Sequence, residues 1–183
     1  MLTNETLNTL NTRRSCRAYA DRPVEAEKIE AILKAGTYAP TAMGQQSPVI
    51  VAVVNKEVRD HLSRMNAAVM GSDKDPFYGA PVDLVVLADT RQPNWKADGS
   101  LVMGNMLNAA ASLGLGSCWI NRAYEMFETE EGKALLKEWG VPNAEYLAGV
   151  GNCVVGYSVP GGEKPAAPRK ENYVVYVLSL IHI

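Results

Sequence analysis

Residues 82–120, VDLVVLADTRQPNWKADGSLVMGNMLNAAASLGLGSCWI, carry the clearest structural pattern in the chain. Val82 to Ala88 is a continuous apolar run rich in β-branched residues, which is typical of a strand covered on both faces. Trp95 to Leu113 follows with an apolar stripe at helical spacing, and the glycines in Gly114–Gly116 predict its end. Ser117 to Ile120 then begins another strand. This order of strand, helix and strand predicts a layered domain built on a central sheet.

Strands and helices alternate on both sides of this stretch, which favours an α/β or α+β class. The segments expected before it are a helix ending near Arg13, an amphipathic helix around Ile29–Leu33 with Gly36 as its C-cap, a doubly covered strand at Val49–Val54 and a helix at Glu57–Met70. Those expected after it are a short helix at Glu130–Trp139, a strand at Leu147–Tyr157 and a final strand near Tyr173. No repeat or long linker interrupts the pattern, so we expect one domain over residues 1–177.

The composition is that of a globular domain without a dominant charge. Hydrophobic residues make up 47% and charged residues 21% of the 183 residues, and the net charge is −2. This balance argues against binding to nucleic acid or a membrane surface through bulk charge, so an anionic ligand needs a local cluster of cations. The polar N-terminus lacks the apolar core of a signal peptide, and we expect a cytoplasmic protein.

Several common kinds of site are missing from the sequence. The three cysteines are far apart and form no CxxC pair, and the two histidines have no neighbour at metal-ligand spacing, so neither a disulfide framework nor a metal site is predicted. No GxGxxG or Walker sequence is present, which argues against a Rossmann or P-loop nucleotide site.

The last six residues, LSLIHI at 178–183, continue the apolar end of the chain without a turn signal or a charge. A last strand and a partner-binding tail are both open alternatives. We expect residues 178–183 to be a non-native or disordered tail and leave them out of the fold prediction.

The densest cationic feature is the run Arg13-Arg14-Ser15-Cys16-Arg17. A terminal phosphate needs several planar, bidentate donors, which arginine supplies better than lysine. The alternative is that these cations complement the C-terminus of the preceding helix. A second basic pair, Arg169-Lys170, lies in a proline-rich loop, where the alternative is a solvated surface.

A second candidate is the loop APTAMGQQSP at residues 39–48. Its small residues let backbone approach a flat ring, with Pro40 and Ala42 against the ring and Gln46 offering a donor and an acceptor. Alone, the loop also suits a plain helix-to-strand connection.

Taken together and in this order, five motifs resemble the nitroreductase family of FMN-dependent oxidoreductases. They are RRSCRAY, APTAMGQQSP, FYGAP, LGLGSCWI and VVGYSVP followed by PRK, and they cover the chain to Val177. The resemblance implies an α+β sandwich with a central, mostly antiparallel sheet flanked by helices. It also implies an intertwined homodimer with FMN at the subunit interface.

The resemblance assigns roles to individual residues. Those implied to hold the ribityl phosphate are Arg13, Arg14, Ser15, Arg17 and Arg169, with Lys170 assisting. The loop implied to follow the ring and ribityl chain supplies Pro40, Thr41, Ala42 and Gln46, with Gln46 contributed across the dimer. The residues implied beside the ring are Asn66 at its pyrimidine edge and Trp119, Ile120 and Asn121, where a backbone N–H reaches the flavin N5 atom. Gly44 departs from the asparagine frequent at that loop position, which removes one side-chain contact.

The implied activity is ping-pong electron transfer from NAD(P)H through FMN to nitroaromatics, quinones or similar small electrophiles. The flavin carries the redox chemistry, so no side chain is needed as an acid, base or nucleophile. Three alternatives remain: a flavin relative with a different reaction such as dehalogenation or desaturation, a flavin carrier without turnover, and an interaction domain without cofactor. Relatives with other reactions usually carry an added lid, for which 183 residues leave little room.

Overall fold

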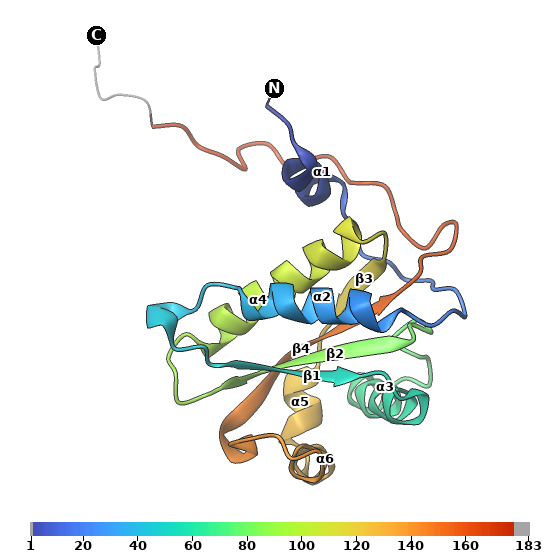
Figure 1. Cartoon of the computed structure of the whole chain (residues 1–183), viewed down its shortest axis with the longest axis vertical. Helices are drawn as coiled ribbons and strands as arrows, with labels where there is room; N and C mark the ends of the chain where they lie inside the picture. The colour runs from blue at the N-terminus through green and yellow to red at the C-terminus, as the bar shows by residue number, and fades with distance from the viewer. Residues whose placement is uncertain (1, 178–183) are drawn as a thin grey trace.

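The computed structural model describes residues 2–177, and the tail expected at 178–183 lies outside them (Figure 1). The helices are α1 (Glu5–Thr12), α2 (Ala26–Thr37), α3 (Lys56–Met70), α4 (Trp95–Ser112), α5 (Ala123–Glu128) and α6 (Glu130–Glu138). The strands are β1 (Pro48–Val53), β2 (Val82–Asp89), β3 (Gly116–Ile120) and β4 (Leu147–Gly156), and two short 3-10 helices are η1 (Ala42–Gly44) and η2 (Ala144–Tyr146). No helix within residues 2–177 is long and apolar enough to cross a bilayer.

The four strands form one antiparallel sheet in the order β1-β2-β4-β3. Helices α2 and α4 cover one face, and α3, α5 and α6 cover the other (Figure 1). Side chains of β2 alternate between the two cores: Leu84 packs toward α2 and α4, and Val85 packs toward the other helices. The expected α+β fold with an antiparallel sheet flanked by helices is therefore confirmed.

Two glycines in β4 are explained by a bulge and a close crossing. Val86 pairs with Gly151 and Leu87 with Gly149, so Val150 is an extra residue in β4. A Cβ on Gly149 would lie 2.2 Å from the carbonyl group of Ala123, the first residue of α5. Glycine therefore lets the start of α5 lie directly against the sheet, just after β3 ends.

The first half of the chain departs from prediction at two points. Gly36 does not cap α2 but lies inside it, buried where an added Cβ would meet Ile50 and Met106 at 2.9 Å. The apolar run at Val49–Val54 forms an edge strand that pairs only with β2, so most of its residues are partly exposed rather than covered on both faces.

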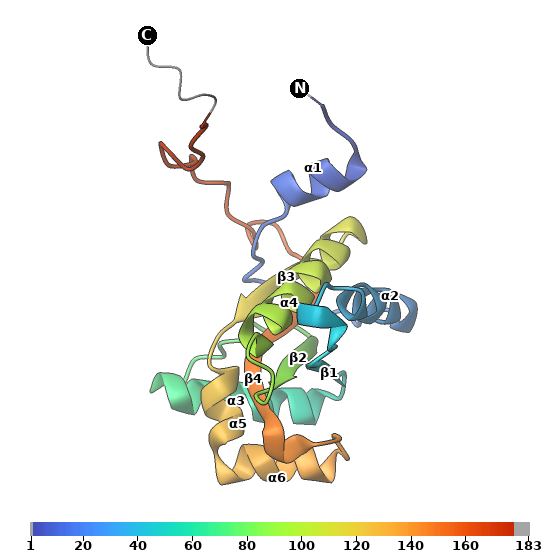
Figure 2. The same cartoon turned by 90° about the vertical axis from the view of Figure 1, so that its left-hand side faces the viewer.

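The other two departures follow β3 in sequence. Helix α5 was missed because six residues are too few to set up a helical period. The final strand expected near Tyr173 is absent: residues 173–177 have no strand structure and are exposed. A strand needs a sheet edge to pair with, and this segment runs away from the sheet of its own chain (Figure 2).

Candidate functional site

A pocket of about 280 Å³ gathers five cations from two ends of the chain. Its lining consists of Arg13, Arg14, Ser15, Arg17, Lys164, Pro165, Ala166, Ala167 and Arg169. No acidic side chain takes part in this lining. Both basic clusters of the sequence thus meet in one place, which we call the cationic pocket.

Backbone hydrogen bonds fix the Arg13–Arg17 segment against β3 and against the loop that leads to Arg169. The Cys16 N–H donates to the Ser117 carbonyl at 2.9 Å, and the Arg17 N–H donates to the Gly162 carbonyl at 2.7 Å. Cys16 is fully buried, and alternate side chains of an extended segment point to opposite sides. Burial of Cys16 therefore turns Ser15 and Arg17 toward the pocket.

The electrostatics of the cationic pocket favour an anionic ligand. Within residues 2–177, none of its five cations forms an ion pair with a carboxylate. The Arg13 Nη1 atom is buried and has no hydrogen-bond partner. A buried guanidinium N–H without a partner is costly, and a phosphate oxygen would satisfy it. The residues present therefore fit a phosphate group.

Two of the predicted cations are used differently. The Arg14 Nη1 donates to the carbonyls of Asn11 at 2.9 Å and Arg13 at 2.6 Å, so this guanidinium is partly committed to the end of α1. Lys170 does not line the pocket, and its Nζ lies 5.3 Å from the Tyr173 ring centroid. Arg169, the neighbour of Lys170, does line it.

The outer edge of β3 leads away from the cationic pocket. The Ser117 carbonyl points to this edge because it accepts from Cys16, and alternate residues of an antiparallel strand face the same way. The backbone groups of Trp119 therefore face the outer edge as well. Ser117 and Ile120, the last residue of β3, are about 10 Å apart along the strand. An elongated molecule anchored in the pocket can follow this edge.

Side chains near the end of β3 point elsewhere. Ile120 is 5% exposed and packs in the core with α3 and α5. The Trp119 side chain lines a separate cavity of about 350 Å³, together with Trp95 and Tyr124. Of Trp119 and Ile120, only the backbone therefore remains for a ligand at the outer edge.

Asn66 is fully buried and fixes the end of β3. Its Nδ2 donates to the Asn121 carbonyl at 2.8 Å and lies 3.1 Å from the Met126 sulfur. Its Oδ1 accepts a hydrogen bond from Arg122 Nε at 2.9 Å. These contacts already occupy most of the hydrogen-bonding capacity of the Asn66 amide. A direct hydrogen bond from Asn66 to a ligand stays a prediction.

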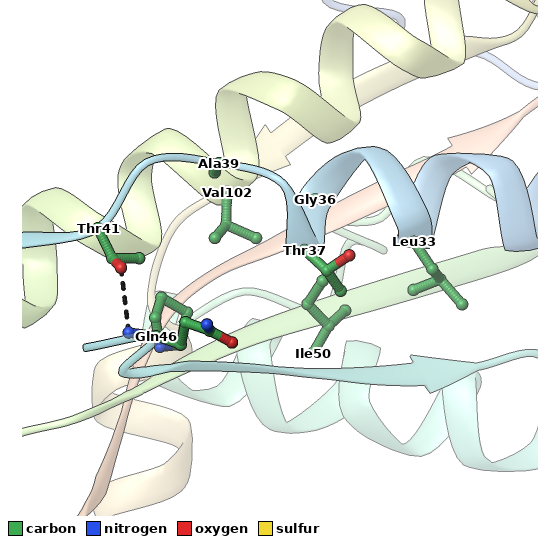
Figure 3. A pocket seen from close by; sticks show the side chains of 9 residues that line it. Leu33, Gly36, Thr37, Ala39, Thr41, Gln46, Ile50 and Val102 are labelled. Atoms are coloured by element: carbon green, nitrogen blue, oxygen red, sulfur yellow. Dashed lines mark hydrogen bonds between the residues drawn. The ribbon is translucent and has the colours of Figure 1, made fainter. Parts of the chain in front are cut away.

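The loop at residues 39–48 is ordered by a buried carboxylate. Asp98, in the first turn of α4, accepts from the Ala42 N–H at 3.0 Å and from Ser47 Oγ at 3.1 Å. Thr41 Oγ1 accepts from the Gln46 N–H at 3.0 Å (Figure 3). Both Thr41 and Gln46 line a mainly apolar pocket of about 280 Å³ beside α2 and β1.

This loop and the outer edge of β3 lie at opposite edges of the sheet. The loop leads into β1, and the edges formed by β1 and β3 are about 14 Å apart in a four-stranded sheet. None of Pro40, Thr41, Ala42 and Gln46 lines the cationic pocket. One chain therefore does not bring the two predicted halves of the site together.

Sequence reasoning missed three residues of this region. Lys164 lines the cationic pocket, Arg122 is tied to Asn66, and Asp98 holds the loop. A further cation in the loop before Arg169 was a signal for Lys164. Neither Arg122 nor Asp98 belongs to a local motif, and their contacts reach 56 residues along the chain.

The described residues offer no alternative reactive centre of a familiar kind. Between residues 2 and 177, no group of three or more His, Cys, Asp or Glu side chains is placed to hold a metal ion. The three cysteines are buried, unpaired thiols.

Comparison with known proteins identifies relatives over most of the chain. The model of the Nitroreductase family matches residues 10–157. A provisionally named NADH dehydrogenase/NAD(P)H nitroreductase of Archaeoglobus fulgidus is 35% identical over 75% of this chain and 78% of its own length. An FMN reductase [NAD(P)H] of Bacillus subtilis is 28% identical over 62% of this chain and 53% of its own length.

Solved structures of similar shape include two with bound FMN. A nitroreductase from Bacteroides fragilis with bound FMN is 32% identical, has a TM-score of 0.86, and aligns over 96% of this chain and 100% of that one. A nitroreductase from Desulfitobacterium hafniense with bound FMN is 25% identical, has a TM-score of 0.84, and aligns over 96% and 100% of the two chains.

Proposed function

The chain belongs to the nitroreductase family, and from this premise we propose that it is an FMN-dependent oxidoreductase that passes electrons from NAD(P)H to nitroaromatics, quinones or similar small electrophiles. The relatives named as NAD(P)H nitroreductase and FMN reductase, and the two nitroreductases with bound FMN, support the cofactor and the electron donor. The observation that carries the proposal is the cationic pocket with its unpartnered Arg13 Nη1.

The residues of the pocket suit the phosphate of FMN better than that of a dinucleotide. Arg13, Arg17 and Arg169, with Lys164 and Ser15, offer more donors than a terminal phosphate needs, whereas the edge of β3 beyond them offers only backbone groups. We assign these five residues to phosphate binding. We assign Lys170 to the surface and Arg14 chiefly to the end of α1.

The outer edge of β3 would hold the flavin ring. There Trp119 presents its backbone groups, and Asn66 fixes the position of the chain just beyond them through the Asn121 carbonyl. Bound FMN supplies the two-electron chemistry, and the protein orients it and limits access of water.

We infer that the site is completed by a second copy of the chain. The predicted ligand loop lies at the β1 edge of the sheet, opposite the β3 edge of its own chain, so a partner must supply its residues Pro40, Thr41, Ala42 and Gln46. Exposed apolar surface supports a homodimer: α1 buries none of its residues, Leu10 is 51% exposed, and residues 173–177 are exposed throughout.

Mass analysis of the released cofactor, followed by anaerobic titration with NADH, tests the proposal. We expect one FMN per subunit, bleaching of the flavin band by NADH, and recovery of the band on addition of a quinone. Release of FAD, or a protein that stays colourless after soaking with FMN, would overturn the assignment. A bound flavin that no nicotinamide reduces would leave a carrier instead of an enzyme.

A further inference from the structure

Arg122 has an unusual backbone for its residue type. It follows Asn121 at the end of β3 and lies in the left-handed region, with φ 76° and ψ 6°. A residue with a Cβ rarely adopts this conformation, which glycine adopts freely. An arginine kept in such a position suggests a function for its side chain.

One buried amide holds this arginine in place. Asn66 Oδ1 accepts from Arg122 Nε at 2.9 Å, while Asn66 Nδ2 donates to the Asn121 carbonyl at 2.8 Å. Asn66 is fully buried and comes from α3, so its amide is fixed by the core of the protein. The backbone at Asn121 and the guanidinium of Arg122 are therefore set by the same side chain.

The charge of Arg122 is not neutralised within the chain. Among residues 2–177, no carboxylate lies in ion-pair distance of its guanidinium, which is half-buried. This positive charge stands just past the end of β3 that is remote from the cationic pocket. A ring that follows the edge meets this charge after the phosphate has been bound.

We propose that Arg122 places positive charge beside the flavin ring and raises the reduction potential of the flavin, with Asn66 as the residue that positions Arg122. This inference rests on the proposed function. Taking up two electrons and one proton adds one negative charge to FMN. A nearby guanidinium stabilises that reduced form more than the oxidised one, and so favours transfer of electrons from NAD(P)H to the protein.

The test compares R122G with R122K in the full-length protein. R122G removes the charge and suits the left-handed backbone, so it should fold; R122K keeps a charge but lacks the Nε–H that Asn66 holds. We measure dissociation constants for oxidised and reduced FMN and the midpoint potential. In R122G, affinity for reduced FMN should fall about tenfold more than affinity for oxidised FMN, which lowers the potential by about 30 mV.

The controls separate charge at the site from charge in general. K137A removes an exposed lysine of α6 and should leave the potential unchanged. R122K should stay closer to the natural chain than R122G does. N66A should lower the potential in the same direction as R122G, and if it does not fold, R122G still decides.

Three results would overturn the inference. They are an unchanged potential in R122G, equal losses for the two forms of FMN, and a shift in R122K as large as that in R122G. A stable N66A with an unchanged potential would remove the positioning role. Failure of the natural protein to bind FMN would overturn the proposed function as well, whereas normal binding and reduction with an unchanged R122G potential overturns this inference alone.

Discussion

Arg169 and Lys170 are neighbouring exposed cations, and only Arg169 lines the cationic pocket. This gives a matched pair of substitutions that remove the same charge. Loss of a charge-assisted hydrogen bond to phosphate costs about 1.5–3 kcal/mol, so Arg169→Ala or Arg17→Ala should weaken FMN binding about 10- to 150-fold. Lys170→Ala should change it little. Fluorescence titration of the apoprotein with FMN measures both, and equal losses at 169 and 170 would contradict the assignment.

Asp83 is a buried acid that the proposed function does not use. It is fully buried in β2, neither carboxylate oxygen has a hydrogen-bond partner, and burial raises its pKa to about 8, against the partial opposing effect of the Arg59 charge. In the unfolded chain the group ionises near pH 4. Between about pH 4 and pH 8 the unfolded state therefore binds fewer protons than the folded state, and the free energy of unfolding must fall as pH rises.

Asp83→Asn should remove this pH dependence. We expect the free energy of unfolding of the natural chain to fall relative to the variant between pH 5 and pH 8, with a limiting slope of about 1.4 kcal/mol per pH unit. Urea unfolding at four pH values measures the difference, in which the shared effects of other groups cancel. Parallel profiles for the two proteins would show that Asp83 ionises normally.

Local clusters were predictable at this scale, and pairings between distant residues were not. The run from Arg13 to Arg17 indicates an anion-binding site because its charges are close together in sequence. Arg122 carries no such signal, since its partner Asn66 is 56 residues away and its left-handed backbone depends on where β3 ends. Lys170 is the reverse case: it is adjacent to Arg169 in sequence, yet it does not line the pocket.

Among the elements, those with a full period or a buried apolar run were predicted well. Helix α4 and strand β2 are close to their predicted bounds because each satisfies its pattern within its own residues. The edge strand β1 has the same apolar character as a central strand, so sequence alone did not reveal its exposed side. Residues 173–177 have the composition of a strand, yet pairing also requires a sheet edge beside the segment, which composition does not encode.

The crossing of α5 over β4 depends on Gly149. In Gly149→Ala, the new methyl group would lie 2.2 Å from the Ala123 carbonyl, so α5 must shift. We expect a loss of about 1–3 kcal/mol in unfolding free energy and weaker flavin binding, because Arg122 directly precedes α5. Denaturant unfolding and FMN titration measure these effects.

Gly104→Ala is the control for a glycine inside α4. Apart from its own helical turns, no atom of the described residues lies within 4 Å of a Cβ at this position, so the substitution should stabilise the helix by roughly 0.5–1 kcal/mol. A loss of dimer in Gly104→Ala would instead place a partner subunit against α4. Equal, small effects at 149 and 104 would contradict the packing described for α5.

At the scale of the whole molecule, several features remain unexplained by one chain. Figure 1 and Figure 2 place α1 and the segment leading to residue 177 outside the layers formed by the sheet and its covering helices, with α1 near one end of α4. The predicted ligand loop lines a different pocket from the cationic pocket that it should complete. The segment predicted as a strand near Tyr173 does not lie beside a sheet edge of its own chain, while the outer edge of β1 has no neighbour among the described residues. The proposed homodimer would account for all of these, with residues 173–177 of one copy packed on the other.

Two truncations that differ by five residues test this arrangement. Ending the chain after Val177 removes only residues 178–183, which the pattern of the domain does not require, so dimerisation, the flavin spectrum and the melting temperature should all be unchanged. Ending it after Asn172 also removes Tyr173–Val177, whose exposed side chains should bury apolar surface on the partner at roughly 1.5–3 kcal/mol for each one fully covered. Because dimers of this kind typically bury more than about 2,000 Å², losing a whole segment should shift the protein toward monomer and reduce FMN occupancy. Light scattering coupled to size exclusion gives the mass, and the absorbance ratio of flavin to protein gives the occupancy. A flavin-loaded monomer of the full-length chain would contradict the dimer outright. Loss of dimer on removal of residues 178–183 alone would show that the tail belongs to the fold.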